Sequence, residues 1–455
     1  MDRAGKDAGA PSGFSFHFAN DTNRTRISLA GTLDLTRDAR LELDFDLAPL
    51  LNAPRPISFA KDGSSTHSRE GDPIAAALQA NQPGAFLVRR VSAIAAAPVK
   101  VAELKPLYLP EKFTPYRFTM SAVFPIPDLP RDNPLIEERV ALGEKLFHEP
   151  LLSKDNAISC ASCHDRRAAF TDPRRYSVGV RQQLGTRNAM PLFNLAWRNS
   201  FFWDGRAPTL RAQALMPIQD HTEMDESLSN VVAKLSKAES GKQKMEMGYA
   251  DGFNAAFGLP EITPEKIGLA LEFFVLTLTS FDSKFDRAFR GEATLTDTEK
   301  RGFELFMTEY DPRREQYGAD CFHCHGGALF QSQTFANNGL DPDLALTKLF
   351  DVRAKVSSGE FDSGRHRVTG RDADRGKFST PSLRNIALTA PYMHDGRFAT
   401  LEEAVAHYSS GVRRSATLDP NLAKHPDGGL HLSAEDQRAL VAFLSTLTDE
   451  KFLNR

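Results

Sequence analysis

The pattern of hydrophobic and polar positions divides the chain into an N-terminal and a C-terminal part. Residues 14–50 alternate between apolar and polar with the period of two that is typical of half-buried strands. Residues 73–98 add an alanine-rich stretch of helical character and a strand-like stretch that begins at Ala85. We therefore expect a small, mainly β module over residues 1–105.

A change of pattern follows this module. Proline becomes frequent, and residues 106–126 are predicted to form a linker. The period then changes to that of amphipathic helices, first at Leu135–Phe147, which carries one apolar stripe. Pro264–Phe281 is apolar over too long a stretch for a strand and predicts a buried helix. Beyond the linker we expect helices to dominate.

Two later helices have recognisable starts. Glu299 follows Thr296 at the spacing of a capping box, in which each side chain accepts a hydrogen bond from the other residue's backbone N–H. A similar signature at Ser433 precedes the predicted final helix, Leu440–Leu447. We expect these helices to frame the C-terminal part of the chain.

All four cysteines fall in two copies of one motif. The spacing is Cys-x-x-Cys-His, at residues 160–164 and 321–325. This spacing is the attachment signature of c-type haem. The two thiols bind the vinyl groups along one edge of the porphyrin, and the histidine binds the iron. The predicted haem-binding residues are Cys160, Cys163 and His164 for the first haem, and Cys321, Cys324 and His325 for the second.

Other uses of cysteine explain the motif less well. A four-cysteine zinc site gives no reason for a histidine after each pair, and the pairs are far apart in the sequence. A thioredoxin-like redox motif follows a strand in a βαβ unit, and two copies would be unusual. Structural disulfides do not need this spacing. We therefore expect two covalently bound haems.

The order of elements repeats around the two motifs. Helix, haem motif, long loops and a further helix follow one another twice. The predicted fold is mainly α, with two tandem cytochrome c-like domains at residues 127–294 and 295–455, preceded by the mainly β module.

Composition narrows the possible surroundings of the protein. Of 455 residues, 41% are hydrophobic and 25% charged, with a formal net charge of −3, which is ordinary for a soluble protein and unlike the basic surface of a nucleic-acid binder. No apolar run approaches the ~20 residues that cross a bilayer. The first residues contain no apolar signal segment. Because haem is attached to such motifs outside the bacterial inner membrane, we expect a periplasmic protein whose leader is absent from this chain.

Several sequence blocks surround the haem motifs. They are Leu142–Phe147, Gly185–Asn188, Phe202–Ala207, Thr380–Ile386 and Ala390–Phe398. In this order the blocks resemble the bacterial di-haem cytochrome c peroxidases and their MauG-type relatives, over about residues 127–450. The resemblance implies that the first haem reacts with hydrogen peroxide and that the second transfers electrons.

The resemblance also assigns roles near the first haem. Glu223 matches the family's distal acid, which moves a proton between the peroxide oxygens while their bond breaks. Gln213 matches the neighbouring amide that orients peroxide, and Trp203 matches the aromatic residue that relays electrons between the haems. From the residues alone, a solvated loop position is the more common role for Glu223. Trp203 could be a core residue and a relay at the same time.

A calcium ion between the haem domains is a further implication of the resemblance. Asn188, Thr389 and Pro391 match the positions that hold this ion in the family. Amide and carbonyl oxygens, with water, suit a hard cation.

Two departures from the peroxidase pattern bear on the mechanism. Many peroxidases carry a histidine that blocks the first haem until the second is reduced, but Val180 occupies the corresponding place, which predicts an open first haem. The peroxidases also place a methionine ligand on the second haem, where this chain has Tyr408. Leu401, Val405 and Tyr408 share one helical face, and His407 is a rival ligand.

Ligand chemistry decides between the candidate functions. Thioether sulfur favours ferrous iron, whereas a phenolate stabilises high-valent iron. Tyr408 is the MauG-type choice, so we expect both haems to share the oxidising equivalents of peroxide in a bis-iron(IV) state. The electrons would come from a small redox protein or from an oxidisable side chain on a partner protein. The alternatives are a conventional detoxifying peroxidase and a non-catalytic electron-transfer cytochrome. The sequence leaves the oligomeric state open.

The N-terminal module lies outside these blocks. Residues 64–86 faintly resemble the MbnP-type copper-associated proteins, which would place His67 near a metal. A solvated His67, or a docking or substrate-restricting module, is equally compatible with the sequence.

Overall fold

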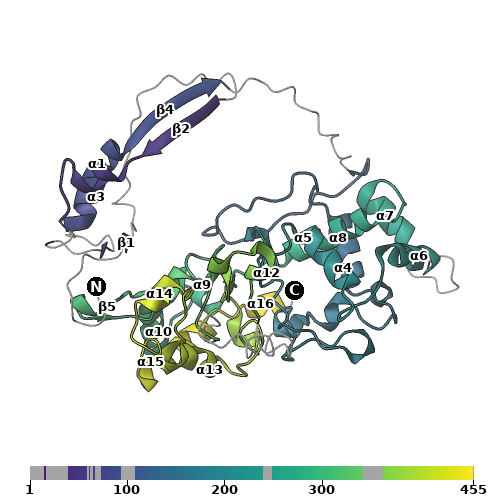
Figure 1. The fold of residues 1–455 in the computed structure, drawn as a ribbon. Coiled ribbons are helices and arrows are strands. Elements are labelled where there is room, and N and C mark those ends of the chain that lie inside the picture. Colours follow the sequence, from purple (N-terminus) through teal and green to yellow (C-terminus); the bar gives the residue numbers. More distant parts are fainter. Residues whose placement is uncertain are drawn as a thin grey trace. The chain divides into compact units, whose positions relative to one another are not determined.

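A computed structural model describes residues 15–16, 39–58, 61, 65–66, 73–93, 108–238, 248–341 and 362–453. The chain divides into two compact units, Met1–Lys105 and Pro106–Arg455. Helices dominate the larger unit, whereas the longest strands, β2 and β4, belong to the smaller one (Figure 1). The protein is mainly helical, as predicted.

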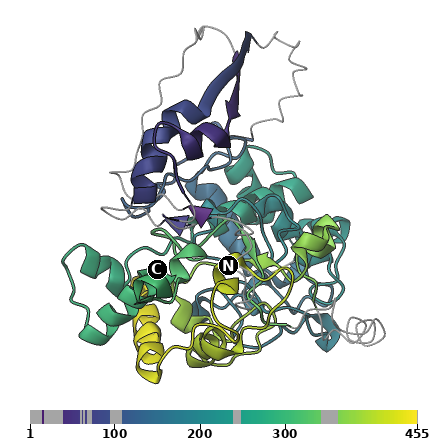
Figure 2. The ribbon, with the colours of Figure 1, turned by 60° about the vertical axis from the view of Figure 1, so that its left-hand side comes forward.

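The N-terminal unit is built on one pair of strands. β2 (Ala39–Phe45) runs antiparallel to β4 (Phe86–Ala93), and the helices α1 (Leu47–Asn52) and α3 (Pro73–Ala85) lie between them in sequence (Figure 2). A small apolar core joins the two helices; its buried members are Leu50, Ile74, Leu78 and Ala85. The strand-like stretches near residues 41 and 85 thus do form strands.

Other predictions for this unit concern residues that the structure covers sparsely. A two-residue strand, β1 (Ser15–Phe16), pairs in parallel with β3 (Ser65–Thr66). The strands predicted between residues 17 and 38 lie outside the described residues, as does His67.

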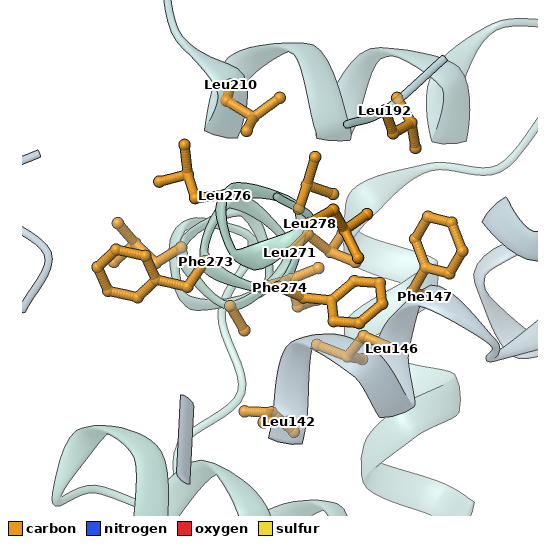
Figure 3. Packing of buried hydrophobic residues seen from close by; sticks show 14 of the residues in the cluster. Leu142, Leu146, Phe147, Leu192, Leu210, Leu271, Phe273, Phe274, Leu276 and Leu278 are labelled. Carbon is orange, nitrogen blue, oxygen red and sulfur yellow. The ribbon is translucent and has the colours of Figure 1, made fainter. Parts of the chain in front are cut away.

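The first haem motif belongs to a lobe built around α8 (Pro264–Thr277), which we call the first lobe. In Figure 3, α8 is seen along its axis, with Leu142 and Leu146 of α4 (Glu137–Phe147) on one side and Leu210 of α5 (Leu210–Gln219) on the other. This lobe also contains α6 (Leu228–Ala238) and α7 (Tyr249–Phe257). Burial of most of its length, from Lys266 to Leu276, explains why α8 is largely apolar, as its sequence predicted.

The second haem motif belongs to a second lobe, in which α10 (Asp297–Met307) packs against α15 (Ala434–Ser445) and α15 packs against α13 (Leu401–Ala406). The capping box of Thr296 and Glu299 is present at the start of α10. Ser433 caps α15 directly, so this helix begins at Ala434 and the predicted bounds, Leu440–Leu447, were wrong.

Shorter elements complete the larger unit. They are α9 (Lys284–Phe289), α12 (His366–Thr369), α14 (Pro420–Ala423), α16 (Glu450–Leu453), and the strand pairs β5 (Tyr310–Asp311) with β6 (Gln316–Tyr317) and β7 (Phe335–Ala336) with β8 (Phe378–Ser379). No helix in the described ranges is long and apolar enough to span a membrane.

Two segments tie the lobes and the proline-rich stretch together. Phe124, within the predicted linker, is buried, and the Trp197 indole N–H donates to the carbonyl oxygen of Pro125 over 2.6 Å. From the opposite end of the chain, Phe452 of α16 packs into the core of the first lobe, against Phe170 and Phe193. The C-terminal end therefore belongs structurally to the first lobe.

Candidate functional site

The first haem motif forms part of the wall of a cavity of about 620 Å³. Cys160 begins a 3-10 turn (Cys160–Ser162), and Cys160, Cys163 and His164 all line the cavity. The Nδ1–H of His164 donates to the carbonyl oxygen of Phe170 over 2.8 Å. This hydrogen bond leaves the Nε2 lone pair available to bind iron. Burial lowers the pKa of His164, which favours the neutral, ligating form.

The second haem motif repeats this arrangement around a cavity of about 210 Å³. Cys321 begins a 3-10 turn (Cys321–His323), and Cys321, Cys324 and His325 line the cavity. The Nδ1–H of His325 donates to the carbonyl oxygen of Pro381 over 3.1 Å. Burial lowers the pKa of His325 to about 4 and again favours the neutral imidazole.

The four cysteines fit thioether attachment of two haems. All four are free, and each pair lines its own cavity, so they form neither disulfides nor one common zinc site. Burial raises the pKa of Cys160, Cys321 and Cys324 to about 12, which disfavours the thiolate form that zinc requires.

The residues predicted to act on peroxide lie in the first cavity. Gln213 lines it from α5, whose first turn is capped by the Thr209 hydroxyl. Glu223 lines it from the turn after α5. Burial, with a contribution from the carboxylate of Asp220 and against that of the Arg206 cation, raises the pKa of Glu223 to about 7. A carboxyl group with this pKa is suited to proton transfer at neutral pH.

The loop that contains Val180 packs against Glu223. The N–H of Val180 donates to the carbonyl oxygen of Glu223 over 2.8 Å, and Val180 itself is buried. Gly179 makes this approach possible, because a Cβ atom there would lie 2.0 Å from the carbonyl oxygen of Thr222. Among the described residues that line the first cavity, His164 is the only histidine.

Trp203 lines both cavities. Its indole N–H donates to the carbonyl oxygen of Asn188 over 2.8 Å, and its own carbonyl oxygen accepts from the N–H of Ser379 over 2.7 Å. These two bonds fix the ring and the backbone of Trp203 at the boundary between the haem cavities.

Tyr408 lines the second cavity and follows α13 in a π-helical turn (His407–Gly411). Such turns are frequent at functional sites because they rotate side chains out of the regular helical register. His407 is not among the residues lining this cavity, and its Nε2 lies 3.1 Å from the carbonyl oxygen of Asn338. The geometry therefore favours Tyr408 over His407 as a ligand. Burial raises the pKa of Tyr408 to about 12, so a phenolate there needs a cation such as ferric iron.

Met393 and Asn338 also line the second cavity, and sequence reasoning missed both. The Asn338 Nδ2 atom lies 3.3 Å from the Met393 sulfur and 3.3 Å from the Tyr408 hydroxyl oxygen. One amide thus holds a thioether and a phenol close together. The only available signal was that Met393 lies within a block that carries the family resemblance.

Arg206 was also missed, although it lies in the block that contains Trp203. It lines the first cavity, its guanidinium carbon is 3.5 Å from the centre of the Phe202 ring, and it is paired with Asp204. A cation is therefore held in the cavity wall that contains Glu223.

The three residues predicted to hold calcium lie on segments joined by a hydrogen bond. Asn188 and Thr389 are buried, and the N–H of Asn188 donates to the carbonyl oxygen of His394 over 2.8 Å. His394 follows Thr389 and Pro391 closely in the chain. The Asn188 amide N–H₂ donates to two carbonyl oxygens, so its own oxygen is the atom that suits a cation. Calcium stays a prediction.

Comparisons with known proteins agree with this geometry. The family model for di-haem cytochrome c peroxidase matches residues 137–294. The methylamine utilization protein MauG of Methylorubrum extorquens is 35% identical over 323 residues, which cover 70% of this chain and 81% of that protein. The cytochrome c551 peroxidase of Nitrosomonas europaea is 34% identical over 336 residues, which cover 73% of this chain and 86% of that protein.

A solved structure matches the fold as well. A MauG-like protein associated with microbial copper homeostasis has a TM-score of 0.61 and 34% identity, over 74% of this chain and 97% of that one. With two relatives of at least 30% identity matched over most of their length, and with two haem motifs in matching cavities, the chain belongs to the di-haem cytochrome c peroxidase family, which includes MauG.

Proposed function

We propose that this di-haem peroxidase stores both oxidising equivalents of peroxide across its two haems, in the bis-iron(IV) manner of MauG. One observation carries the proposal: the two haem cavities are unequal. Among the described residues, the first is lined by an acid, an amide and no histidine other than His164, whereas the second is lined by Tyr408 together with its haem motif. The first suits a reactive haem with an open position, and the second suits a haem with two protein ligands.

Proton transfer in the first cavity is the proposed work of Glu223. Its carboxylate would take the proton from one peroxide oxygen and return it to the other, so that water leaves as the O–O bond breaks, with the haem supplying the electrons when bound. A pKa of about 7 keeps both protonation forms accessible at neutral pH. The Gln213 amide, in the same cavity, would orient peroxide through hydrogen bonds.

Trp203 and Tyr408 are the residues that would let the second haem share the oxidising equivalents. The Trp203 ring borders both cavities and is held by Asn188, which suits an electron relay between them. A phenolate from Tyr408 would stabilise oxidised iron at the second haem.

The proposed oxidant and electron donor are inferred from the chemistry of the reaction and not from the geometry of the site. Peroxide is the oxidant, and a small redox protein or an oxidisable side chain on a partner protein would return the electrons. We propose a periplasmic location, because covalent haem attachment takes place there, and a calcium ion at Asn188. The N-terminal unit would serve as a docking site for the partner protein. A related solved structure is of a MauG-like protein associated with copper homeostasis, so a copper-associated protein is one candidate for this partner.

A conventional detoxifying peroxidase is the second candidate. Met393 favours it, because its sulfur lies in the second cavity beside Tyr408, and a thioether ligand would raise the potential of that haem. The 34% identity to a cytochrome c551 peroxidase is compatible with this candidate as well.

Stoichiometric peroxide added to the diferric protein tests the proposal. The visible and near-infrared spectra should show a long-lived, coupled oxidised state that forms without prior reduction. Rapid return to the diferric state, with turnover sustained by reduced cytochrome c, would favour the detoxifying peroxidase. A fully low-spin resting spectrum that peroxide does not change would establish the electron-transfer cytochrome instead.

A further inference from the structure

A cluster of ionisable side chains lies beside the second haem motif, and the proposed peroxide chemistry does not use it. Glu309 follows α10, Asp320 and His323 belong to the haem-motif segment, and Lys424 and His425 follow α14. Glu309 and Asp320 are buried. Three chain segments therefore bring acidic and basic groups together in the interior of the second lobe.

Three of these residues already have the spacing of metal ligands. One potential ligand atom from each of Glu309, Asp320 and His323 lies within 4.8 Å of the other two. The Glu309 Oε2 atom is 2.8 Å from the His323 Nε2 atom. Asp320 is held in a left-handed conformation, with φ of 55°, and its Oδ1 atom accepts the N–H of Tyr310 over 2.9 Å. Its other oxygen, Oδ2, contacts Lys424 and His425.

His425 supplies an independent observation. Its side chain is 0% exposed, and neither ring nitrogen has a hydrogen-bond partner. Its Nε2 atom nevertheless lies 2.9 Å from the Asp320 Oδ2 atom, without the alignment of a hydrogen bond. Burying an unpartnered polar group is costly. Two atoms that bind one metal ion at about 2.0–2.2 Å lie roughly 3.0–3.5 Å apart, so a small shift of either side chain would let the pair share an ion.

We propose that Glu309, Asp320, His323 and His425 form a binding site for a divalent transition-metal ion of the zinc class. Two imidazole nitrogens and two carboxylate oxygens are ligands that zinc accepts. The site is distinct from both haems and from the predicted calcium position, and it does not depend on the proposed function.

Lys424 occupies the place of the cation in the metal-free arrangement. Its ammonium nitrogen lies 3.0 Å from the Asp320 Oδ2 atom and also contacts Glu309. The side chain is 30% exposed, and its flexible stem lets the ammonium group swing into solvent. The metal ion and the lysine would therefore compete for the same two carboxylates.

A metal ion bound at this site would change the reduction potential of the second haem. His323 lies between Cys321 and Cys324, and Asp320 lines the haem cavity. A bound dication there disfavours the more positive, oxidised form of the haem, because like charges repel. Metal binding should thus raise the reduction potential of the second haem and leave the first nearly unchanged.

Zinc binding to the chelator-treated holoenzyme tests the site. Equilibrium dialysis should find one zinc ion per chain, and zinc X-ray absorption should show nitrogen and oxygen ligands at about 2.0–2.1 Å. His425→Gln should weaken binding by at least about tenfold, because a ligand is lost. Lys424→Met should strengthen it by about tenfold, because the competing cation is removed. His221→Gln, at a surface histidine that is 82% exposed, should change nothing.

Two results would overturn the site. One is absence of bound zinc in both the unaltered enzyme and Lys424→Met, which would leave the cluster as an ion-pair network. The other is zinc affinity that falls with His221→Gln and not with His425→Gln. The haem absorption spectrum of each variant reports whether it has folded, and the gain of affinity in Lys424→Met cannot arise from misfolding. A zinc-induced rise in the potential of the second haem, absent in His425→Gln, completes the test.

Discussion

The two haem lobes share one plan and differ in the side chains that line their haem cavities. In each lobe a glycine of the helix before the haem motif touches the last long helix of that lobe. A Cβ at Gly143 would lie 2.1 Å from the Ala270 carbonyl oxygen, and one at Gly302 would lie 1.9 Å from that of Ala439. In each lobe the motif histidine donates through Nδ1 to a backbone carbonyl oxygen.

The differences concern the other residues that line each cavity. The first cavity, of about 620 Å³, contains Glu223 and Gln213, whereas the second, of about 210 Å³, contains Tyr408 and Met393. The shared plan positions the haem motif and its histidine, and under the proposed function the residues that differ between the cavities would decide whether the haem reacts. This is the usual division of labour between a rigid scaffold and its loops.

Removal of the proposed distal acid, Glu223, should have the largest effect on the difference between the two haems. Glu223→Gln keeps the size of the side chain and removes its proton transfer, so the rate of reaction with peroxide should fall by about 10²–10⁴-fold. Stopped-flow absorption measures this rate. Glu111→Gln, at an exposed residue, is the control and should react normally. A rate close to that of the unaltered enzyme in Glu223→Gln would remove Glu223 from the mechanism.

Exchange of Tyr408, the proposed ligand of the second haem, should reduce the sharing of oxidising equivalents between the two haems. Tyr408→Met should raise the potential of the second haem and shorten the lifetime of the peroxide-oxidised state by at least about tenfold, because a thioether stabilises oxidised iron less well than a phenolate. Redox titration and near-infrared spectroscopy measure both effects.

The neighbouring histidine provides the matched control for this change. His407→Gln should preserve the spectrum of the second haem, because the His407 ring faces the carbonyl oxygen of Asn338 rather than the cavity. Loss of the second haem's low-spin spectrum in His407→Gln, but not in Tyr408→Met, would reverse the ligand assignment.

Substitution of Gly143 and Gly302 tests the close helix contacts that the two lobes share. Gly143→Ala and Gly302→Ala should each lower the free energy of unfolding by about 1–3 kcal/mol, because the added methyl group meets backbone that cannot yield easily. Thermal denaturation of the holoenzyme measures the loss. In Gly185→Ala the nearest neighbouring atom lies 3.8 Å from the new Cβ, so this control should lose much less stability. Equal losses of stability in all three variants would show that the close helix contacts at Gly143 and Gly302 do not require glycine.

The smallest expected effect is a change of pH dependence. Since Glu223 must be deprotonated to accept the peroxide proton, the rate should rise with pH through its pKa of about 7. The Arg206 cation lowers that pKa, whereas burial and Asp220 raise it. Arg206→Gln should therefore move the midpoint of the profile to higher pH. A midpoint that stays in place or moves to lower pH would show that Arg206 does not act on Glu223.

Local features were predictable from the sequence because they depend on neighbouring residues. The capping box of Thr296 and the apolar length of α8 both gave helices where expected. Prediction of the helix end was poorer: α8 ends at Thr277 rather than Phe281, since the chain turns at Leu278 and the Leu278 carbonyl oxygen accepts from Asn194. That turn depends on a partner far away in the sequence.

The distal residues could not be derived from local pattern at all. Glu223 meets Gln213 in one cavity because the chain turns back after α5, and only the family resemblance pointed to this pair. Met393 escaped notice because its place in the second cavity depends on a left-handed backbone conformation, with φ of 76°. Arg206 escaped because a cation stacked on Phe202 has no sequence pattern of its own.

Electron paramagnetic resonance of the resting, diferric protein tests the inequality of the two haems most directly. We expect one high-spin ferric signal, from a haem at His164 with an open position, and one low-spin signal, from a haem held by His325 and Tyr408. One molar equivalent of peroxide should abolish both signals together. Two low-spin signals that persist after peroxide would show that the two haems are not unequal in this way.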